Sequence, residues 1–571
     1  MPPRILTTIG SRELGLSPGG LSELDACVAK FPREHLMLRT ISVLHALSAD
    51  RASGHRMVNA TFAGALGADY QASLSEALAK ENASFLEPLQ QLVLLRRAMT
   101  VCDERGQVDV ATDAGLHLYF DACRFTADLV ATTYVEATSD TKVEIGLKTA
   151  AGFLPRIWLT NPVNPNYWTA RARLMLDRIP AGNPALAARS AALKGRFPTT
   201  IGLSYEEVAT IVQFLSYWTI APDLQSIFRK HGSIRLNPDT WLIETDVPPE
   251  AFRALLKRTA WDWTERLSDS SYGGPLSVLP FRDRPFVTFR DGTVAPAARE
   301  FVLEKLTADL FWWLKDPDVP QSQLWQADWG VLAEGYVSWL LEQAAVASNC
   351  GFARNVKWGD EELDAAIWFK GHVALVEVSS SGLSDEAGNS GDWTKLKTGL
   401  QQTFVQSTRP GKPPKAEAIM QLARDVRALL DGTLAEHIPI RPDALTRVYP
   451  VLVATDRRLR VPGAWYYLNA KLQEATGPTL ASALVPLNVE DVEEVEQLLN
   501  YRGAEFRGTP PGILRVLRRW DVDRGSGPSW WQFMEWLAGP VLLSRHIKEE
   551  MGRWKDEVRS HFKTDPWTEH H

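Results

Sequence analysis

The chain has 571 residues, of which 45% are apolar and 23% are charged, and its formal net charge is −7. This length is too great for one ordinary hydrophobic core and predicts about three domains. The composition is that of an ordered globular protein rather than a disordered one. The acidic balance argues against a basic nucleic-acid coat protein but is compatible with a local positive groove.

The cysteine pattern and the hydropathy of the sequence indicate where in the cell the protein is expected to reside. Cys27, Cys102, Cys123 and Cys350 lie far apart and form no CxxC pair, which argues against a zinc ribbon and a disulfide framework. The sequence has no signal-peptide core and no run of about 18 apolar residues. We therefore expect a cytoplasmic protein with no membrane span.

Residues 1–270 have mostly helical patterns and carry no chemistry that we recognise. Residues 84–87 and 204–207 each place a serine three positions before a glutamate, the spacing of a capping box at a helix start. Residues 132–135 and 142–145 have β propensity and predict a short strand pair. The role of this region stays open.

The stretch 360–379 predicts a β-hairpin. Alternating and β-branched residues flank Lys370-Gly371, where glycine can supply the positive φ of a two-residue turn. With this turn, Asp364 faces Glu377 across the two strands.

Two opposed carboxylates repel each other unless a positive group lies between them. Directly opposed Cβ atoms are about 4.5–5.5 Å apart, and like charges at this spacing destabilise a sheet. Oxygen ligands suit Mg²⁺ or Mn²⁺, so we expect Asp364 and Glu377 to hold one of these cations. The alternative is an exposed hairpin with acids on its solvent face.

Other predicted elements surround the hairpin in a definite order. A helix over residues 327–345 carries Glu334 and precedes the hairpin. A helix capped by Asp392 follows it, then a helix over 416–430 that carries Gln421, and then an apolar strand over 449–454. This order, over roughly residues 328–470, resembles that of the PD-(D/E)xK nuclease superfamily.

The resemblance implies roles for these residues. Asp364 and Glu377 would be metal ligands, Glu334 a helical acid that adds to the site, and Gln421 an auxiliary polar residue. The family's lysine, two residues after the second acid, is replaced here by Ser379. Serine supplies no positive charge to the reaction, and such electrostatic help commonly contributes several kcal/mol.

Two explanations of this replacement stay open. Either the enzyme is impaired, or another cation substitutes, for which Lys395 and Lys397 on the following helix are candidates. Glu362, which the hairpin register places opposite Ser379, would enlarge the acidic cluster.

We therefore expect an α/β nuclease-like domain, with a mixed central sheet flanked by helices, within a mainly helical multidomain chain. The predicted divisions are a helical region (1–270), a connecting region (271–327), the nuclease-like domain (328–480) and a helical C-terminal region (481–571). A basic and aromatic cluster over 515–520 is either a nucleic-acid contact or a solvated helical face.

The predicted function is that of a metal-dependent nuclease that cleaves DNA, or RNA as the less expected substrate, in a defence or nucleic-acid-processing system. The alternative is a catalytically inactive nuclease-like protein that acts as a nucleic-acid-binding or assembly subunit with protein partners. P-loop and HExxH motifs are absent from the sequence.

Overall fold

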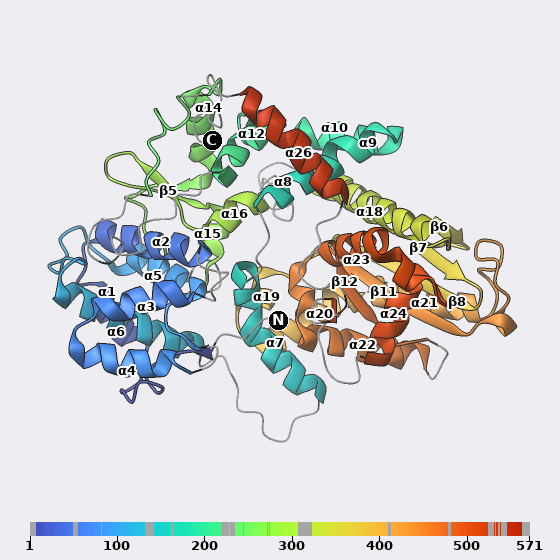
Figure 1. Cartoon of the computed structure of the whole chain (residues 1–571), viewed down its shortest axis with the longest axis horizontal. Helices are drawn as coiled ribbons and strands as arrows, with labels where there is room; N and C mark the ends of the chain where they lie inside the picture. Colours follow the sequence, from blue (N-terminus) through green and yellow to red (C-terminus); the bar gives the residue numbers. More distant parts are fainter. Residues whose placement is uncertain are drawn as a thin grey trace.

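A mixed five-stranded sheet forms the centre of the second half of the chain in the computed structural model (Figure 1). Strands β6, β7 and β8 are antiparallel neighbours, and β8, β11 and β12 are parallel neighbours. Their bounds are β6 (Gly351–Trp358), β7 (Glu361–Phe369), β8 (His372–Ser379), β11 (Arg447–Ala454) and β12 (Val485–Asn488). The structure describes residues 7–49, 55–80, 83–131, 142–160, 165–217, 228, 234–243, 245–270, 272, 274–305, 322–408, 413–477, 481–523, 530, 533–534, 537 and 545–561.

The hairpin of β7 and β8 has the predicted turn and register. Its ladder reaches Ala365 opposite Val376, as expected for a turn at Lys370-Gly371. The left-handed backbone falls on Lys370, with a φ of 52°, and not on the glycine as we expected. Gly371 is required for space instead, because a Cβ there would lie 2.3 Å from the carbonyl oxygen of Ala444.

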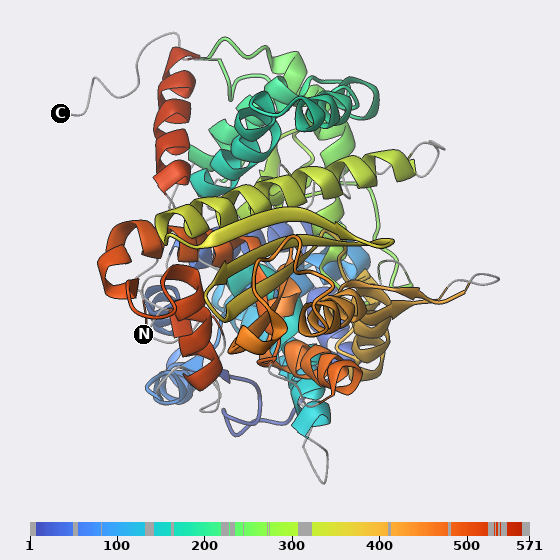
Figure 2. The ribbon, with the colours of Figure 1, turned by 90° about the vertical axis from the view of Figure 1, so that its right-hand side faces the viewer.

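Helices cover both faces of this sheet, so the predicted mixed sheet flanked by helices is confirmed. Because side chains alternate along a strand, Ala374 and Val376 of β8 join one core, whereas Val373 and Leu375 join the other. Helix α18 lies along the first face (Figure 2). The first face is covered by α18 (Ser322–Ala347), α23 (Val489–Arg502) and α24 (Gly512–Asp523), and the second by α20 (Trp393–Leu400), α21 (Ala418–Leu430) and α22 (Pro462–Thr476).

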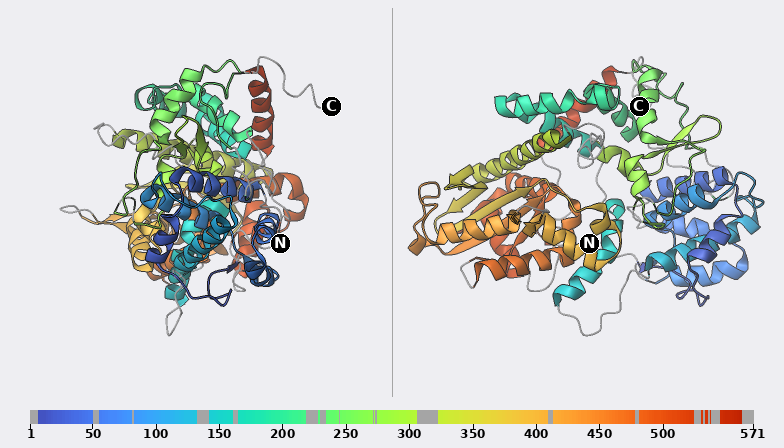
Figure 3. Two further views of the ribbon diagram at one scale, coloured as in Figure 1. Left: turned by 90° about the vertical axis from the view of Figure 1, so that its left-hand side faces the viewer. Right: turned by 180° about the vertical axis from the view of Figure 1, so that it is seen from behind.

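The N-terminal helices form a separate core at the opposite end of the molecule from the five-stranded sheet (Figure 3). The predicted helical character of this region is confirmed. A small three-stranded sheet contributes Trp261, Val287 and Ala295 to the same core. The elements are β1 (Thr7–Thr8), α1 (Leu21–Val28), α2 (Arg33–Ala49), α3 (Arg56–Ala65), α4 (Ala68–Leu78), β2 (Ala83–Ser84), α5 (Pro88–Val101), α6 (Asp113–Ala131), β3 (Ala260–Trp261), α15 (Leu279–Asp283), β4 (Phe286–Thr288) and β5 (Val294–Pro296).

Two local predictions for the N-terminal region are wrong. Residues 142–145 begin helix α7 (Lys142–Thr160) and form no strand, and residues 132–135 lie outside the described part of the chain. Glu87, not Ser84, is the N-cap of α5, and Gln90 completes its capping box. The box at Ser204 is confirmed, since its Oγ accepts a 3.2 Å hydrogen bond from the backbone N–H three residues later.

Tertiary packing explains why α7 is a helix. Its Leu147, Ala150 and Leu154 recur at helical spacing and are buried in the core on the second face of the five-stranded sheet. Where α7 crosses α22, a Cβ on Gly463 would lie only 1.7 Å from the carbonyl oxygen of Gly146. Packing of this apolar face therefore overrides the weak β propensity of the first turn.

A middle layer of helices shares the core on the first face of the sheet. This core contains residues from Trp168 to Trp554 and includes members of all four predicted divisions, so where the domains end stays a prediction. The layer comprises α8 (Pro165–Arg173), η2 (Leu174–Arg178), α9 (Ile179–Ala181), α10 (Pro184–Lys194), α11 (Phe197–Thr200), α12 (Tyr205–Tyr217), α14 (Pro249–Thr259), α16 (Arg299–Glu304) and the C-terminal helix α26 (Arg545–Ser560).

Several short elements complete the described chain. They are α19 (Asp385–Asn389), η3 (Gln401–Val405), β9 (Gln406–Ser407), β10 (Lys415–Ala416), η4 (Pro442–Ala444), η5 (Arg457–Arg460) and η6 (Gly503–Phe506). In the described ranges, no helix combines the length and the apolar character that a membrane span requires. All four cysteines are free thiols.

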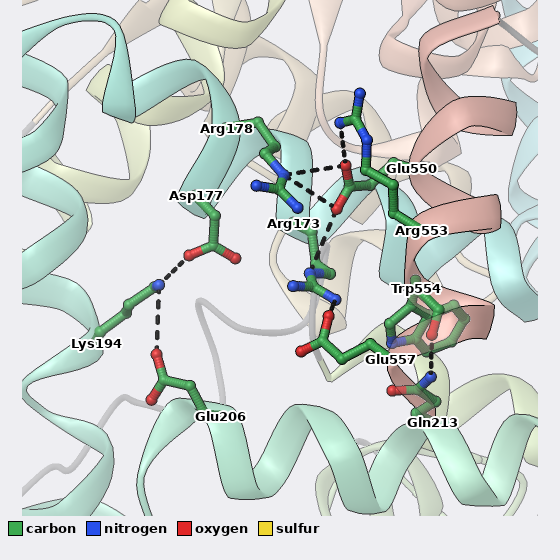
Figure 4. A network of polar contacts seen from close by, with 10 residues as sticks. All are labelled: Arg173, Asp177, Arg178, Lys194, Glu206, Gln213, Glu550, Arg553, Trp554 and Glu557. Atoms are coloured by element: carbon green, nitrogen blue, oxygen red, sulfur yellow. Dashed lines mark hydrogen bonds and ion pairs between the residues drawn. The ribbon is translucent and has the colours of Figure 1, made fainter. Parts of the chain in front are cut away.

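Buried ion pairs fasten α26 to the middle layer (Figure 4). Glu550 is fully buried, and its carboxylate lies 3.1 Å from Arg178, 3.1 Å from Arg553 and 3.5 Å from Arg173. A buried carboxylate is costly unless cations compensate for the lost hydration, and here guanidinium groups surround it.

Replacing Glu550 by glutamine is expected to lower the free energy of unfolding by about 2 kcal/mol, because the buried carboxylate loses its charge-assisted contacts with three guanidinium groups. The neighbouring Glu549→Gln is the matched control. Glu549 is 42% exposed and pairs with Arg545 at the surface, so its loss should change stability by less than about 1 kcal/mol. Urea unfolding followed by circular dichroism measures both, and equal effects would contradict the role of Glu550.

Candidate functional site

Three acids singled out in the sequence come together at the end of the β7–β8 hairpin farthest from its turn. The ladder of paired residues ends, going away from the turn, with Ala365 and Val376. Asp364 and Glu377 are each one residue farther from the turn than this pair. Glu334 reaches them from α18. The charge of Asp364 acts on both glutamates, and that of Glu334 acts on Glu377.

The side chain of Asp364 is fixed by the backbone of β8. Its Oδ2 accepts a 2.6 Å hydrogen bond from the N–H of Val378. On the other side, the ladder between β6 and β7 skips the position opposite Asp364, where Asn355 has a φ of 51°. A carboxylate therefore stands where the sheet is locally irregular, as is common next to functional sites.

Gly330 allows α18 to approach the end of β8. A Cβ at Gly330 would lie 3.0 Å from the Oγ of Ser380 and 3.9 Å from the Oε1 of Glu334. Gly330 and Glu334 are one helical turn apart and share the face of α18 that meets the hairpin. The half-buried position of Glu334 follows from this close contact.

A fourth acid, Asp425 of α21, lies beside Glu377, and we did not predict it. Only 4% of Glu377 and 2% of Asp425 is exposed. The indole N–H of Trp358 donates a 3.0 Å hydrogen bond to the Oδ1 of Asp425. The Oε1 of Glu377 and the Oδ2 of Asp425 are buried and accept no hydrogen bond from an N–H or hydroxyl group of the described residues.

Burial and mutual repulsion make these acids unusually weak. Burial, together with the carboxyls of Asp364 and Glu362, raises the pKa of Glu334 from 4.5 to about 8. Burial raises the pKa of Asp364 to about 6, although the N–H of Val378 opposes the change.

The pair formed by Glu377 and Asp425 is perturbed in the same direction. Burial, followed by the charges of Asp364 and Asp425, raises the pKa of Glu377 well above 4.5. Burial raises the pKa of Asp425 to about 7, against the hydrogen bond from Trp358. When Glu377 is protonated it can donate a hydrogen bond to Asp425, and when both carboxyls are ionised their charges repel each other.

Several buried acids elsewhere in the chain have arginine partners. Glu490 and Glu493 lie 2.8 and 2.7 Å from nitrogens of Arg171, and Asp456 lies 2.7 Å from Arg458. In the acid cluster, by contrast, the charged groups that shift the pKa of Glu334 and of Asp364 are carboxyls. We use the name acid cluster for Glu334, Asp364, Glu377 and Asp425. It is the arrangement expected where a cation is supplied from outside the chain.

A divalent cation fits the donors of the acid cluster. All of them are carboxylate oxygens, the ligands preferred by Mg²⁺ and Mn²⁺, and two of these oxygens are buried and accept no hydrogen bond from an N–H or hydroxyl group of the described residues. No group of three or more His, Cys, Asp or Glu side chains in the described ranges is arranged as a ready-made metal site. The fit therefore rests on the chemistry of the donors.

The position of the missing lysine is buried. Ser379 ends β8, is 9% exposed and lies opposite Ala454 of β11. Its side chain is two residues beyond Glu377 and thus on the same face of the strand. Glu362, expected opposite Ser379, does not form that pair, and its ladder partner is Lys357 of β6.

The proposed substitutes for the lysine do not reach inward. The Nζ of Lys395 lies 3.0 Å from the Oε1 of Glu386, and both side chains are exposed. Lys397 is exposed as well. Asp392 caps α20 as predicted, with Oδ1 accepting a 2.8 Å hydrogen bond from the N–H of Thr394, and this start of the helix turns Lys395 toward solvent.

Gln421 lies on α21 one turn before Asp425, which occupies the place nearest Glu377. Gln421 is half-buried, while Asp425 interacts with Glu377 and Asp364. The sequence held a signal for Asp425, because a charged residue stands beside the predicted apolar stripe of Leu422 and Val426.

The basic cluster over 515–520 lies elsewhere. Arg518 acts electrostatically on His372, which begins β8, whereas the acid cluster lies at the end of that strand. Trp520 is fully buried, so the cluster is not a uniformly solvated face. Its arginines are thus not placed beside the acids.

Comparison of the chain with known proteins identified no related protein. The chain matches no protein-family model, no curated protein and no solved structure. The functional argument therefore rests on the geometry and electrostatics of the acid cluster.

The raised pKa of Glu334 predicts a pH-dependent stability of the metal-free protein. Glu334 ionises near 4.5 when unfolded and at about 8 when folded. Its contribution is complete below pH 4.5 and is lost as the pH rises through 8. The urea midpoint should therefore fall over this window, and Glu334→Gln should flatten the fall.

Asp431→Asn is the control for this measurement. Asp431 is exposed, and its hydrogen bonds with Thr433 lower its pKa below 3.8, so its titration lies outside the window. If the urea midpoint falls with pH as steeply in Glu334→Gln as in the wild type, the prediction is wrong.

Proposed function

We propose that the acid cluster binds Mg²⁺ or Mn²⁺ and that the chain is a metal-dependent nuclease acting on DNA, with RNA as the second candidate substrate. The observation that carries the proposal is Glu377, a 4% exposed carboxyl whose pKa is raised by burial and by neighbouring acids, with no cation among the described groups that act on it. A cytoplasmic role in defence or nucleic-acid processing belongs to the same proposal, as do protein partners in a larger assembly.

Electrostatics favour a bound cation over a purely structural cluster. Two unit charges 4 Å apart interact by about 4 kcal/mol at the effective dielectric constant near a protein surface. Without a cation the acids avoid this repulsion by holding protons, as their raised pKa values indicate. A divalent ion between them would instead stabilise the ionised carboxylates.

Different acids of the cluster would have different roles in the reaction. A bound divalent cation would polarise a scissile phosphate and lower the pKa of an attacking water. Asp364 and Glu377 would hold it, and the hydrogen bond from Val378 leaves the Oδ1 of Asp364 as the oxygen available to a ligand. Glu334, whose pKa is about 8, holds a proton near neutral pH while no cation is bound.

The alternative function is a nuclease-like protein that binds nucleic acid or a partner without cleaving it. Ser379 in place of the lysine favours it, together with the outward position of Lys395. The two functions differ in whether hydrolysis occurs, so cleavage and metal binding separate them.

Incubation with single- and double-stranded DNA and RNA in Mn²⁺ is expected to give cleavage that a chelator stops. Asp364→Ala and Glu377→Ala should each reduce the rate by about 100-fold or more, because metal ligation supplies several kcal/mol of transition-state stabilisation. Asp431→Ala, which changes an exposed acid at the end of α21, should cleave like the wild type. Cleavage unchanged in the first two variants would refute the proposal.

Ser379→Lys is expected to raise the cleavage rate by about tenfold or more, since it restores a positive charge next to the acid cluster. Ser379→Met is the matched control, because it adds a chain of similar bulk without charge at the same buried position. Equal rates in the two variants would show that the missing charge does not limit the reaction. Cleavage by Ser379→Lys alone, with an inactive wild type, would favour the alternative function.

A further inference from the structure

Asp425 is a buried acid whose charged neighbours among the described residues are other acids rather than cations. It lies within α21, away from both ends of the helix, and is 2% exposed between the apolar Leu422 and Val426. A carboxylate at such a position destabilises the fold unless it is paired. The adjacent Arg424 does not compensate for it, because its guanidinium pairs with Glu361.

One contact of Asp425 fixes the orientation of its carboxylate. Trp358 donates its indole N–H to Oδ1 at 3.0 Å, and Trp358 itself stands on β6, at the edge of the sheet. This bond sets the rotation of the carboxylate. Oδ2, like the Oε1 of Glu377, is buried and accepts no hydrogen bond from an N–H or hydroxyl group of the described residues, so the polar group next to it is the carboxyl of Glu377.

We infer that Asp425 is an additional carboxylate ligand of the divalent cation, supplied by α21, and that Trp358 is a positioning residue that orients it. This inference rests on the proposed function, since it concerns the same cation. It places ligands on both a strand and the helix packed against it, so that the cation joins α21 to the sheet. Asp425 thereby takes the helical position that we had assigned to Gln421.

The inference predicts that replacing Asp425 affects metal affinity but does not lower the stability of the metal-free fold. Without a cation, Asp425 adds repulsion to a buried group of acids, so the near-isosteric Asp425→Asn should leave the melting temperature at pH 8 unchanged or raise it. With Mn²⁺ present, the same variant should lose most of the temperature increase that the metal gives the wild type. A merely structural Asp425 would show the reverse, a lower metal-free melting temperature and an unchanged increase.

Calorimetric titration of the full chain with MnCl₂ provides the test. Asp425→Asn should weaken Mn²⁺ binding by tenfold or more, and Trp358→Phe by several-fold. The double variant should bind no more weakly than Asp425→Asn, because Trp358 acts only through Asp425. Asp431→Asn, an exposed acid six positions further on, is the matched control and should bind like the wild type.

The outcomes distinguish this inference from the proposed function. If Asp364→Asn abolishes Mn²⁺ binding while Asp425→Asn keeps the wild-type affinity, Asp425 is not a ligand and the proposed function stands. If the effects of Asp425→Asn and Trp358→Phe add fully, the positioning role of Trp358 is wrong. If the wild type binds no Mn²⁺, the proposed function fails and this inference fails with it.

Discussion

The register of the β7–β8 hairpin is the constraint on which the acid cluster depends. Side chains alternate between the faces of a sheet, so a slip of one residue would turn Glu377 to the opposite face and separate it from Asp364. The left-handed Lys370 and the close contact of Gly371 with Ala444 fix the turn. The carboxylates are thus placed by a turn at the far end of their own strands.

Packing of helices on the two faces of the sheet then sets the chemistry of the acids. Contact at Gly330 brings α18 and Glu334 to the end of β8, and the apolar stripe of α21 holds Asp425 against Glu377. Because water is excluded, the charged forms are disfavoured and repulsion between them is poorly screened. Glu550, by contrast, is buried among arginines that offset its charge.

Much of this arrangement could be predicted because it is local in sequence. Alternation around Lys370-Gly371 gave the hairpin and its register, and helical spacing gave the helices that carry Glu334 and Gln421. Predictions from local sequence patterns were wrong where contacts with residues distant in sequence determine the structure. Residues 142–145 are helical because α7 packs on α22, and Lys395 faces solvent because of its position on α20 and its pairing with Glu386.

The sequence by itself determined that Asp364 and Glu377 would lie on neighbouring strands, since a two-residue turn and strict alternation leave one register. Tertiary structure alone decided that Asp425 joins them, because a residue on α21 meets β8 only when the helix packs across the sheet. It also decided how weak these acids are, since a pKa follows from burial and from charges brought together by the fold, which spacing along the chain does not reveal.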